Sequence, residues 1–272
     1  RLPVFPLNPA PVQLSWLGYP GTTGLPQMDY RLTDAIADPQ GPADLNHSEQ
    51  LVRLEGGFHC YAPFEAPPEI GPLPFQKNGF ITFGSFNHIA KITPAVIRTW
   101  VEILKAVPAS KLLLKGGMLD YDAVQDRIKA AFWDLGITRD RVELKGWIAR
   151  DDNPLTLYNS VDICLDTFPY NGTTTSFEAL SMGIPVITLR GARHASRVGA
   201  SILTEIGHSG WIAETASDYK ALAVDLAGDI SQLENCRNSL RKTLENSSFG
   251  DAVGFTARIE ATYQELYAKA SK

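Results

Sequence analysis

The sequence predicts an α/β fold: a doubly wound, Rossmann-like parallel sheet that occupies residues 79–272. Two observations carry this prediction. From residue 79 onward, short apolar runs alternate with longer amphipathic segments, and Gly or Pro stands at many of the junctions. Strands that alternate with helices of ten or more residues pair in parallel, because each helix returns the chain to the same end of the sheet. Residues 1–78 are expected to form a separate N-terminal segment.

This N-terminal segment is rich in Pro and Gly and holds only short apolar runs, such as residues 12–17 and 51–54. Such a composition predicts short strands joined by long loops. Residues 65–74 contain four prolines, which fit neither a helix interior nor a central strand. They are therefore predicted to be a linker.

The larger domain begins with a strand at residues 80–84. Thr93 and Pro94 then form a good N-cap and first-turn pair for a helix with apolar residues on one face. The following strands are predicted at residues 111–114, 141–144, 161–165, 185–189 and 211–213. The following helices are predicted at residues 121–135, 155–160, from the Thr-rich turn to about 182, at 196–206, and consecutively over 217–269.

Composition narrows the class of function. The chain has 272 residues, 44% of them hydrophobic, and a net charge of -5, which argues against nucleic-acid binding driven by bulk charge. No apolar run approaches membrane-spanning length, so no membrane partner is expected. The three cysteines are widely spaced and form no metal or disulfide pattern, which indicates a reducing, cytoplasmic compartment.

The most informative segment is the turn at residues 166–175, with sequence DTFPYNGTTT, which follows an apolar strand and opens a helix. Free backbone N–H groups and the positive end of the helix dipole attract phosphate, and threonine hydroxyls add donors. The alternative is an ordinary capped helix start, since Thr is also a good N-cap.

Ligands of doubly wound sheets bind beyond the carboxyl ends of the strands, so the loops after Phe83, Leu144, Leu165 and Leu189 are expected to line one cleft. Lys91 would bring a cation there, unless it is a solvated lysine beside a helix start. His88 is a weaker candidate, because a histidine in a polar loop is often incidental.

Three further side chains belong to the expected cleft. Glu178 lies one helical turn after Thr174 and could accept hydrogen bonds from ribose hydroxyls, or simply favour the helix N-terminus. Arg197 could pair with phosphate or brace the fold. The loop that ends at Ile148 could contact a base.

At these residues the chain resembles the O-GlcNAc transferase and SPINDLY family of nucleocytoplasmic protein glycosyltransferases. The matching blocks are WLGYPGTTG at 16–24, MDY at 28–30, FGSFN at 83–87, KITP at 91–94 and DICLDTFPYNGTTT at 162–175. The resemblance spans nearly the whole chain, and the blocks are closest to SPINDLY-like and bacterial members.

The resemblance implies a fold and a set of contacts. The family's fold is GT-B, with two Rossmann-like domains, and residues 79–272 are similar to its C-terminal, donor-binding half. Lys91 would contact the diphosphate and act in catalysis, Thr174 and Thr175 would hold phosphates, and Glu178 would bind the ribose. Together, the residues and the resemblance give these candidate substrate-binding residues: Gly18, Tyr19, Pro20, Gly21, His88, Ile148, Tyr170, Asn171, Gly172, Thr173, Thr174, Thr175, Glu178 and Arg197.

The implied activity is transfer of a sugar to Ser or Thr hydroxyls of a protein or peptide acceptor, with inversion at the anomeric carbon. No cofactor and no metal are expected, because a preorganised lysine and helix N-terminus would stabilise the departing diphosphate. The triplet Asp120-Tyr121-Asp122 is interpreted as helix-capping acids rather than a metal motif.

UDP-GlcNAc is the donor most often assigned to this family. Thr173 and His88 stand where animal O-GlcNAc transferases have His and Gln, and SPINDLY proteins use GDP-fucose, which is therefore the alternative donor. The family's N-terminal catalytic domain and tetratricopeptide repeats have no counterpart here, so residues 1–78 are interpreted as a remnant of that domain plus a linker. The other hypotheses are a module that binds a sugar nucleotide without transferring it and, third, an unrelated phosphate-binding α/β enzyme.

Overall fold

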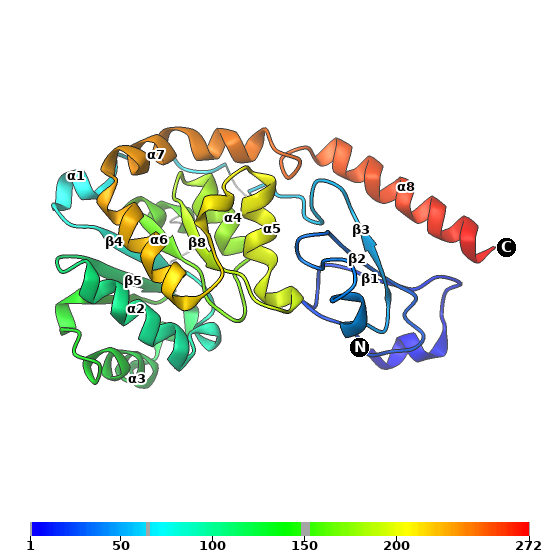
Figure 1. Cartoon of the computed structure of the whole chain (residues 1–272), viewed down its shortest axis with the longest axis horizontal. Helices are drawn as coiled ribbons and strands as arrows, with labels where there is room; N and C mark the ends of the chain where they lie inside the picture. The colour runs from blue at the N-terminus through cyan, green and yellow to red at the C-terminus, as the bar shows by residue number, and fades with distance from the viewer. Residues whose placement is uncertain (1, 64–65, 148–152, 272) are drawn as a thin grey trace.

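A computed structural model of the chain describes residues 2–63, 66–147 and 153–271. It consists of two lobes (Figure 1), one built on a three-stranded sheet and one on a six-stranded sheet. All the strand pairs described in both sheets are parallel. No helix within these residues is both long and apolar enough to cross a membrane.

The smaller sheet has the order β1-β2-β3. Its strands are β1 (Leu14–Ser15), β2 (Tyr30–Thr33) and β3 (Gln50–Arg53), and a 3-10 helix at Leu2–Leu7 precedes them. The apolar runs predicted β1 and β3 but not the central strand β2. That strand buries Arg31 and Thr33, so its buried positions include polar residues that an apolar pattern cannot reveal.

The larger sheet confirms the predicted doubly wound parallel fold. Its order is β6-β5-β4-β7-β8-β9, which is the 3-2-1-4-5-6 order of a dinucleotide-binding sheet. The strands are β4 (Thr82–Ser85), β5 (Lys111–Lys115), β6 (Val142–Lys145), β7 (Ile163–Leu165), β8 (Val186–Leu189) and β9 (Ile212–Ala213). Because the strand order reverses between β4 and β7, the loops that follow these two strands diverge and leave a crevice between them.

Helices cover this sheet on both faces. α2 packs beside α6, and α4 packs beside α7. The helices are α1 (Pro74–Asn78), α2 (Pro94–Ala106), α3 (Asp122–Trp133), α4 (Thr174–Ser181), α5 (Val198–Glu205), α6 (Ala216–Gly228), α7 (Ile230–Glu245) and α8 (Ala252–Ala270). Residues 155–160, predicted as a short helix, belong to a 3-10 helix at Pro154–Ser160. Thr93 caps α2 as predicted, accepting a hydrogen bond from the N–H of Val96.

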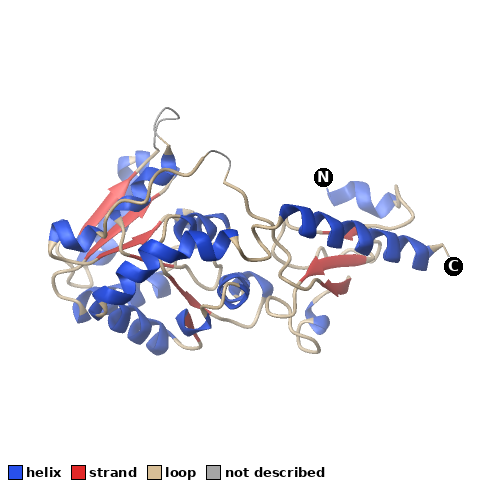
Figure 2. Cartoon of the chain, turned by 90° about the horizontal axis from the view of Figure 1, so that it is seen from above, coloured by secondary structure: helices blue, strands red, loops and turns tan. Residues whose placement is uncertain are grey.

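The last helix, α8, lies against the smaller lobe, so both chain ends are found there (Figures 1 and 2). The Trp16 and Phe255 rings stack with centroids 5.8 Å apart, and the N–H of Tyr61 donates to the carbonyl of Phe249. The chain therefore crosses between the lobes twice, once after β3 and once after α7. The domain boundary after residue 78 stays a prediction.

Candidate functional site

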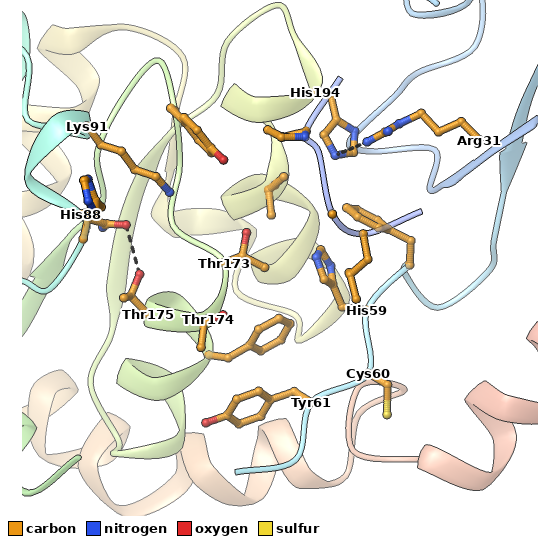
Figure 3. A pocket seen from close by; sticks show the side chains of 18 residues that line it. Arg31, His59, Cys60, Tyr61, His88, Lys91, Thr173, Thr174, Thr175 and His194 are labelled. Carbon is orange, nitrogen blue, oxygen red and sulfur yellow. Dashed lines mark hydrogen bonds between the residues drawn. The ribbon is translucent and has the colours of Figure 1, made fainter. Parts of the chain in front are cut away.

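A cavity of about 460 Å³ opens between the two lobes, beyond the carboxyl ends of β4 and β7 (Figure 3). Its lining comes from the loop around Gly18, from Arg31 in β2, from the segment 58–61, from the loop after β4, from the turn and start of α4, and from the residues around His194 and Val198. Because β4 and β7 are hydrogen-bonded neighbours at the reversal point of the sheet, this is the crevice in which such folds bind ligands.

The turn before α4 is held by a buried carboxylate. Asp166, at the end of β7, accepts hydrogen bonds from the N–H groups of Thr167 and Gly172 and from the hydroxyl of Thr188. Burial raises the pKa of Asp166 to about 6, although these hydrogen bonds and nearby Lys91 oppose the rise. The carboxylate thus occupies the inward N–H groups of the turn and fixes the chain where α4 begins.

The first residues of α4 face the cavity. Thr173, Thr174 and Thr175 all line it, and the helix begins at Thr174 without a side-chain cap from Thr173. The first N–H groups of a helix have no acceptor within the helix, and the helix dipole places partial positive charge there. The threonine hydroxyls and these N–H groups form a site suited to an anion.

Lys91 reaches the same site from the loop after β4. Its Nζ donates to the carbonyl of Asn171 at 2.7 Å and lies 3.9 Å from the centroid of the Tyr170 ring. Burial lowers the pKa of Lys91, while Asp166 counteracts this. The lysine is therefore not a freely solvated side chain: the turn that precedes α4 holds its ammonium group beside the anion site.

His88 also lines the cavity, but its ring is exposed at the rim. Its Nδ1 accepts a hydrogen bond from the N–H of Ala90, at 3.2 Å, and thereby caps the 3-10 helix that carries Lys91. The contact helps to present Lys91 to the cavity.

The Gly18 loop of the smaller lobe forms the opposite wall. Gly18 and Pro20 line the cavity, whereas Tyr19 and Gly21 line a neighbouring pocket. The carboxylate of Glu49 holds the end of this loop, since it accepts hydrogen bonds from both Thr22 and Thr23, three of them at 2.6 Å.

Besides Tyr19 and Gly21, four of the predicted residues within the described chain lie outside the lining. Asn171 and Gly172 are buried behind the turn, where the side-chain amide of Asn171 donates to the carbonyl of Thr167. Glu178 accepts a hydrogen bond from the hydroxyl of Tyr158 at 2.9 Å, and burial raises its pKa. Its ribose contact stays a prediction. Ile148 lies outside the described residues, so the predicted base contact stays a prediction too.

Arg197, the fourth, points toward the smaller lobe. Its guanidinium donates to the carbonyls of Ile36 and Gly191, at 2.8 and 3.0 Å. Of the two roles considered for this residue, these contacts favour bracing the fold.

The expected capping acids behave differently from each other. Asp122 begins α3, but Asp120 accepts a hydrogen bond from the N–H of Trp147 and so ties down the loop after β6. No side-chain cap is formed at the N-cap residue Tyr121. Across the described part of the chain, no group of three or more His, Cys, Asp or Glu residues is arranged to hold a metal ion.

Sequence reasoning missed a buried polar chain along the cavity wall. His194 donates from Nδ1 to Asp38 at 2.7 Å, and its Nε2 lies 3.3 Å from the guanidinium of Arg31. Arginine only donates, so Nε2 accepts and His194 carries its proton on Nδ1. Although burial opposes it, the His194 contact lowers the pKa of Asp38.

These residues are 156 and 163 positions apart, so no local pattern joins them. Only their places in the chain could have pointed to these residues: His194 lies in the loop region after β8, and Arg31 directly follows the matching block at 28–30. His59, which also lines the cavity, stood in no pattern at all.

Known proteins similar to this chain match it from end to end. A SPINDLY protein of Solanum lycopersicum, named as a probable UDP-N-acetylglucosamine–peptide N-acetylglucosaminyltransferase, is 43% identical over 267 residues, covering 98% of this chain and 29% of the relative. A protein of the same name from Arabidopsis thaliana is 42% identical over 272 residues, covering 100% of this chain and 30% of the relative. The chain therefore spans less than a third of these relatives.

The structure of a Thermobaculum terrenum O-GlcNAc transferase mutant is also similar, with 37% sequence identity and a TM-score of 0.89. The match covers 97% of this chain and 49% of that one. The six-stranded lobe thus corresponds to the C-terminal domain of a GT-B glycosyltransferase. A family model described as glycosyl transferase family 41 matches residues 1–61 and 74–259. Since that model covers most of the chain and the relatives match it throughout, this protein belongs to glycosyl transferase family 41.

Proposed function

We propose that this chain is the donor-binding part of a protein O-glycosyltransferase that transfers GlcNAc from UDP-GlcNAc to Ser or Thr hydroxyls of protein acceptors. The relatives are named as probable peptide N-acetylglucosaminyltransferases, and the chain belongs to their family. The chain spans less than a third of their length, so the activity of the whole relatives comes to it only as part of this proposal.

The observation that carries the proposal is the meeting of Lys91 with the N-terminus of α4. The Lys91 Nζ is held 2.7 Å from the carbonyl of Asn171, two residues before Thr173 at the cavity wall. A diphosphate placed there would meet a cation, free N–H groups and threonine hydroxyls together. The Gly18 loop across the cavity is then placed to approach the sugar.

This arrangement fits an inverting transfer. As the acceptor oxygen attacks the anomeric carbon, the bond to the diphosphate breaks and negative charge develops on the departing phosphate oxygen. A fixed ammonium and a helix N-terminus stabilise that charge without reorganising during the reaction. In this mechanism no metal takes part.

GDP-fucose is the second candidate donor. The observation that favours it is the pair Thr173 and His88, which line the cavity where animal O-GlcNAc transferases have other residues. Binding of a sugar nucleotide without transfer is the third possibility, and a transfer assay distinguishes it from the other two. A cytoplasmic location also belongs to the proposal, supported by the free state of Cys60, Cys164 and Cys236.

Calorimetric titration of the chain with UDP-GlcNAc, GDP-fucose, UDP and GDP, followed by a transfer assay on an acceptor peptide, tests these alternatives. We expect UDP and UDP-GlcNAc to bind. Preferential binding of GDP-fucose would mean that GDP-fucose, and not UDP-GlcNAc, is the donor. Binding of a donor without its hydrolysis or transfer would support a module that only binds. If none of the four nucleotides bound, the proposal would be wrong.

A further inference from the structure

His59 is a buried histidine that the proposed diphosphate site does not use. It lies in the segment that leaves the smaller lobe after β3, and its side chain lines the cavity (Figure 3). Only 6% of the residue is exposed. Its ring packs between two aromatic rings, with centroids 3.9 Å from Phe58 and 5.7 Å from Phe177. Aromatic neighbours on both sides hold the imidazole in one position.

Neither ring nitrogen of His59 has a hydrogen-bond partner among the described residues. Nδ1 is fully buried, whereas Nε2 keeps some exposed surface, which in a buried residue that lines the cavity faces the cavity. A largely buried imidazole that makes no hydrogen bond costs free energy, and Nε2 is the atom at which a ligand in the cavity could supply the missing partner.

Burial also determines which nitrogen of the His59 ring carries the proton and whether the ring is charged. A buried N–H without an acceptor is rarer in proteins than an unused acceptor, so the bare nitrogen is Nδ1 and the proton sits on Nε2. Burial, and in addition the nearby His194, lowers the pKa of His59 to about 3, so the ring is neutral near pH 7. His59 thus presents one uncharged N–H donor to the cavity.

The position of His59 indicates which part of a ligand it would meet. The anion-binding groups, Lys91 and the start of α4, both belong to the six-stranded lobe. His59 approaches from the other lobe, as do Gly18 and Pro20. A diphosphate held by the first set would project its sugar toward the second set, where a neutral N–H suits an uncharged oxygen.

We propose that His59 is a specificity-determining residue that donates a hydrogen bond from Nε2 to a hydroxyl or amide oxygen of the donor's sugar. This inference rests on the proposed function, because it needs a sugar nucleotide in the cavity. It predicts that His59 distinguishes the sugar nucleotide from the free nucleotide, and that it contributes little to binding of the diphosphate itself.

The test compares His59→Leu, which removes the donor, with His59→Gln, which keeps an N–H near the position of Nε2. Each variant is titrated with UDP, UDP-GlcNAc, GDP and GDP-fucose in the 272-residue chain. For the sugar nucleotide that the native chain binds, we expect His59→Leu to weaken binding about three- to tenfold, with His59→Gln recovering part of the loss. Affinity for the matching free nucleotide should stay within about twofold in both variants.

Thermal unfolding of the same variants checks that they fold. Leu replaces a side chain with no hydrogen bonds to the described residues, so its unfolding temperature should equal or exceed that of the native chain. An unchanged ratio of sugar-nucleotide to nucleotide affinity in His59→Leu would overturn the role of His59 and leave the proposed function intact. Equal weakening of both ligands would assign His59 to the diphosphate and also overturn the inference. Failure of the native chain to bind any of the four would instead sink the proposed function.

Discussion

At the scale of single residues, the chemistry of the cavity depends on charged side chains that their neighbours hold in place. Lys91 is held by the carbonyl of Asn171 and the ring of Tyr170. Asp166 occupies the inward N–H groups of the turn, so the outward ones remain for a ligand. The hydrogen bonds of Asp166 therefore hold the turn, and the groups from Thr173 to Thr175 that face the cavity are those proposed to bind a ligand.

Lys91→Ala should weaken nucleotide diphosphate binding much more than it lowers stability. Hydrogen bonds to charged groups contribute roughly 1.5–3 kcal/mol, so the affinity for UDP should fall roughly 10- to 100-fold. The loss of its contacts with Asn171 and Tyr170 should lower the unfolding temperature by only about 2–4 °C. Titration and thermal unfolding measure the two effects.

The control is Lys220→Ala, which removes an exposed lysine that pairs with Glu102 on the surface, and which should change neither quantity appreciably. A large loss of stability in Lys91→Ala with a proportionate loss of affinity would show that Lys91 is structural.

Glu49 should make stability depend on pH in the acid range. Although burial raises it, hydrogen bonds from Thr22 and Thr23 lower the pKa of Glu49 to about 2, from 4.5 for a solvated glutamate in the unfolded chain. The unfolded state therefore binds the proton more readily, so this stabilisation is complete above about pH 4.5 and is lost as the pH falls toward 2.

Urea unfolding of the native chain and of Glu49→Gln at several pH values measures this contribution. The native chain should be more stable than the variant at about pH 7, and the difference should shrink steadily below about pH 4.5. A difference that stayed constant from about pH 7 to about pH 3 would show that the carboxylate charge is not what holds the threonines.

At the scale of elements, the turn before α4 joins a strand, a carboxylate and a helix N-terminus within one short segment. Its geometry depends on close packing around Gly172. A Cβ atom at this glycine would lie 2.6 Å from the hydroxyl of Thr175 and 2.9 Å from the side-chain oxygens of Asn87 and Ser176. The absence of a side chain therefore allows the loop after β4 to approach the start of α4.

Gly172→Ala should consequently damage the anion site itself. Overpacking of this kind costs about 1–3 kcal/mol, and the displaced Thr175 should also weaken UDP binding. Thermal unfolding and UDP titration report the two losses. Gly210→Ala is the matched control, because a Cβ there meets nothing within 4 Å. Native affinity in Gly172→Ala would mean that the start of α4 does not bind the diphosphate.

At the scale of the whole molecule, the cavity exists because the two lobes are joined by buried polar contacts. His194 pairs with Asp38, Ser201 binds Asp34, and Arg197 donates to the carbonyl of Ile36. After the second crossing, which follows α7, helix α8 packs on the smaller lobe through the contact of Phe255 with Trp16. These contacts hold the Gly18 loop and His59 opposite the anion site.

Arg197→Ala tests whether this arginine braces the lobes. Loss of its hydrogen bonds should lower the free energy of unfolding by about 1–3 kcal/mol. Because Arg197 does not line the cavity, UDP affinity should change much less than in Lys91→Ala. Denaturant unfolding and UDP titration distinguish the roles: reduced affinity at native stability would instead indicate a phosphate contact.

The architecture of the larger lobe, and the turn at which its candidate anion site lies, could both be predicted from the amino-acid sequence. Strand and helix periods are local, so they predicted β4 to β9 and the helices between them. The turn at 166–175 carries its strand end, glycine and helix start within one segment, which made it visible without any long-range contact. The resemblance of the blocks at 16–24 and 162–175 predicted the family.

Other features could be recognised only in the tertiary structure. The three-stranded sheet pairs β2 with its neighbours although this strand buries Arg31, and the fold brings Arg31, Asp38 and His194 together across more than 150 residues. The fold also turns Arg197 toward the smaller lobe and His59 into the cavity. Burial and polar pairing across the lobes depend on long-range packing, and such packing leaves no period in the sequence from which these contacts could be predicted.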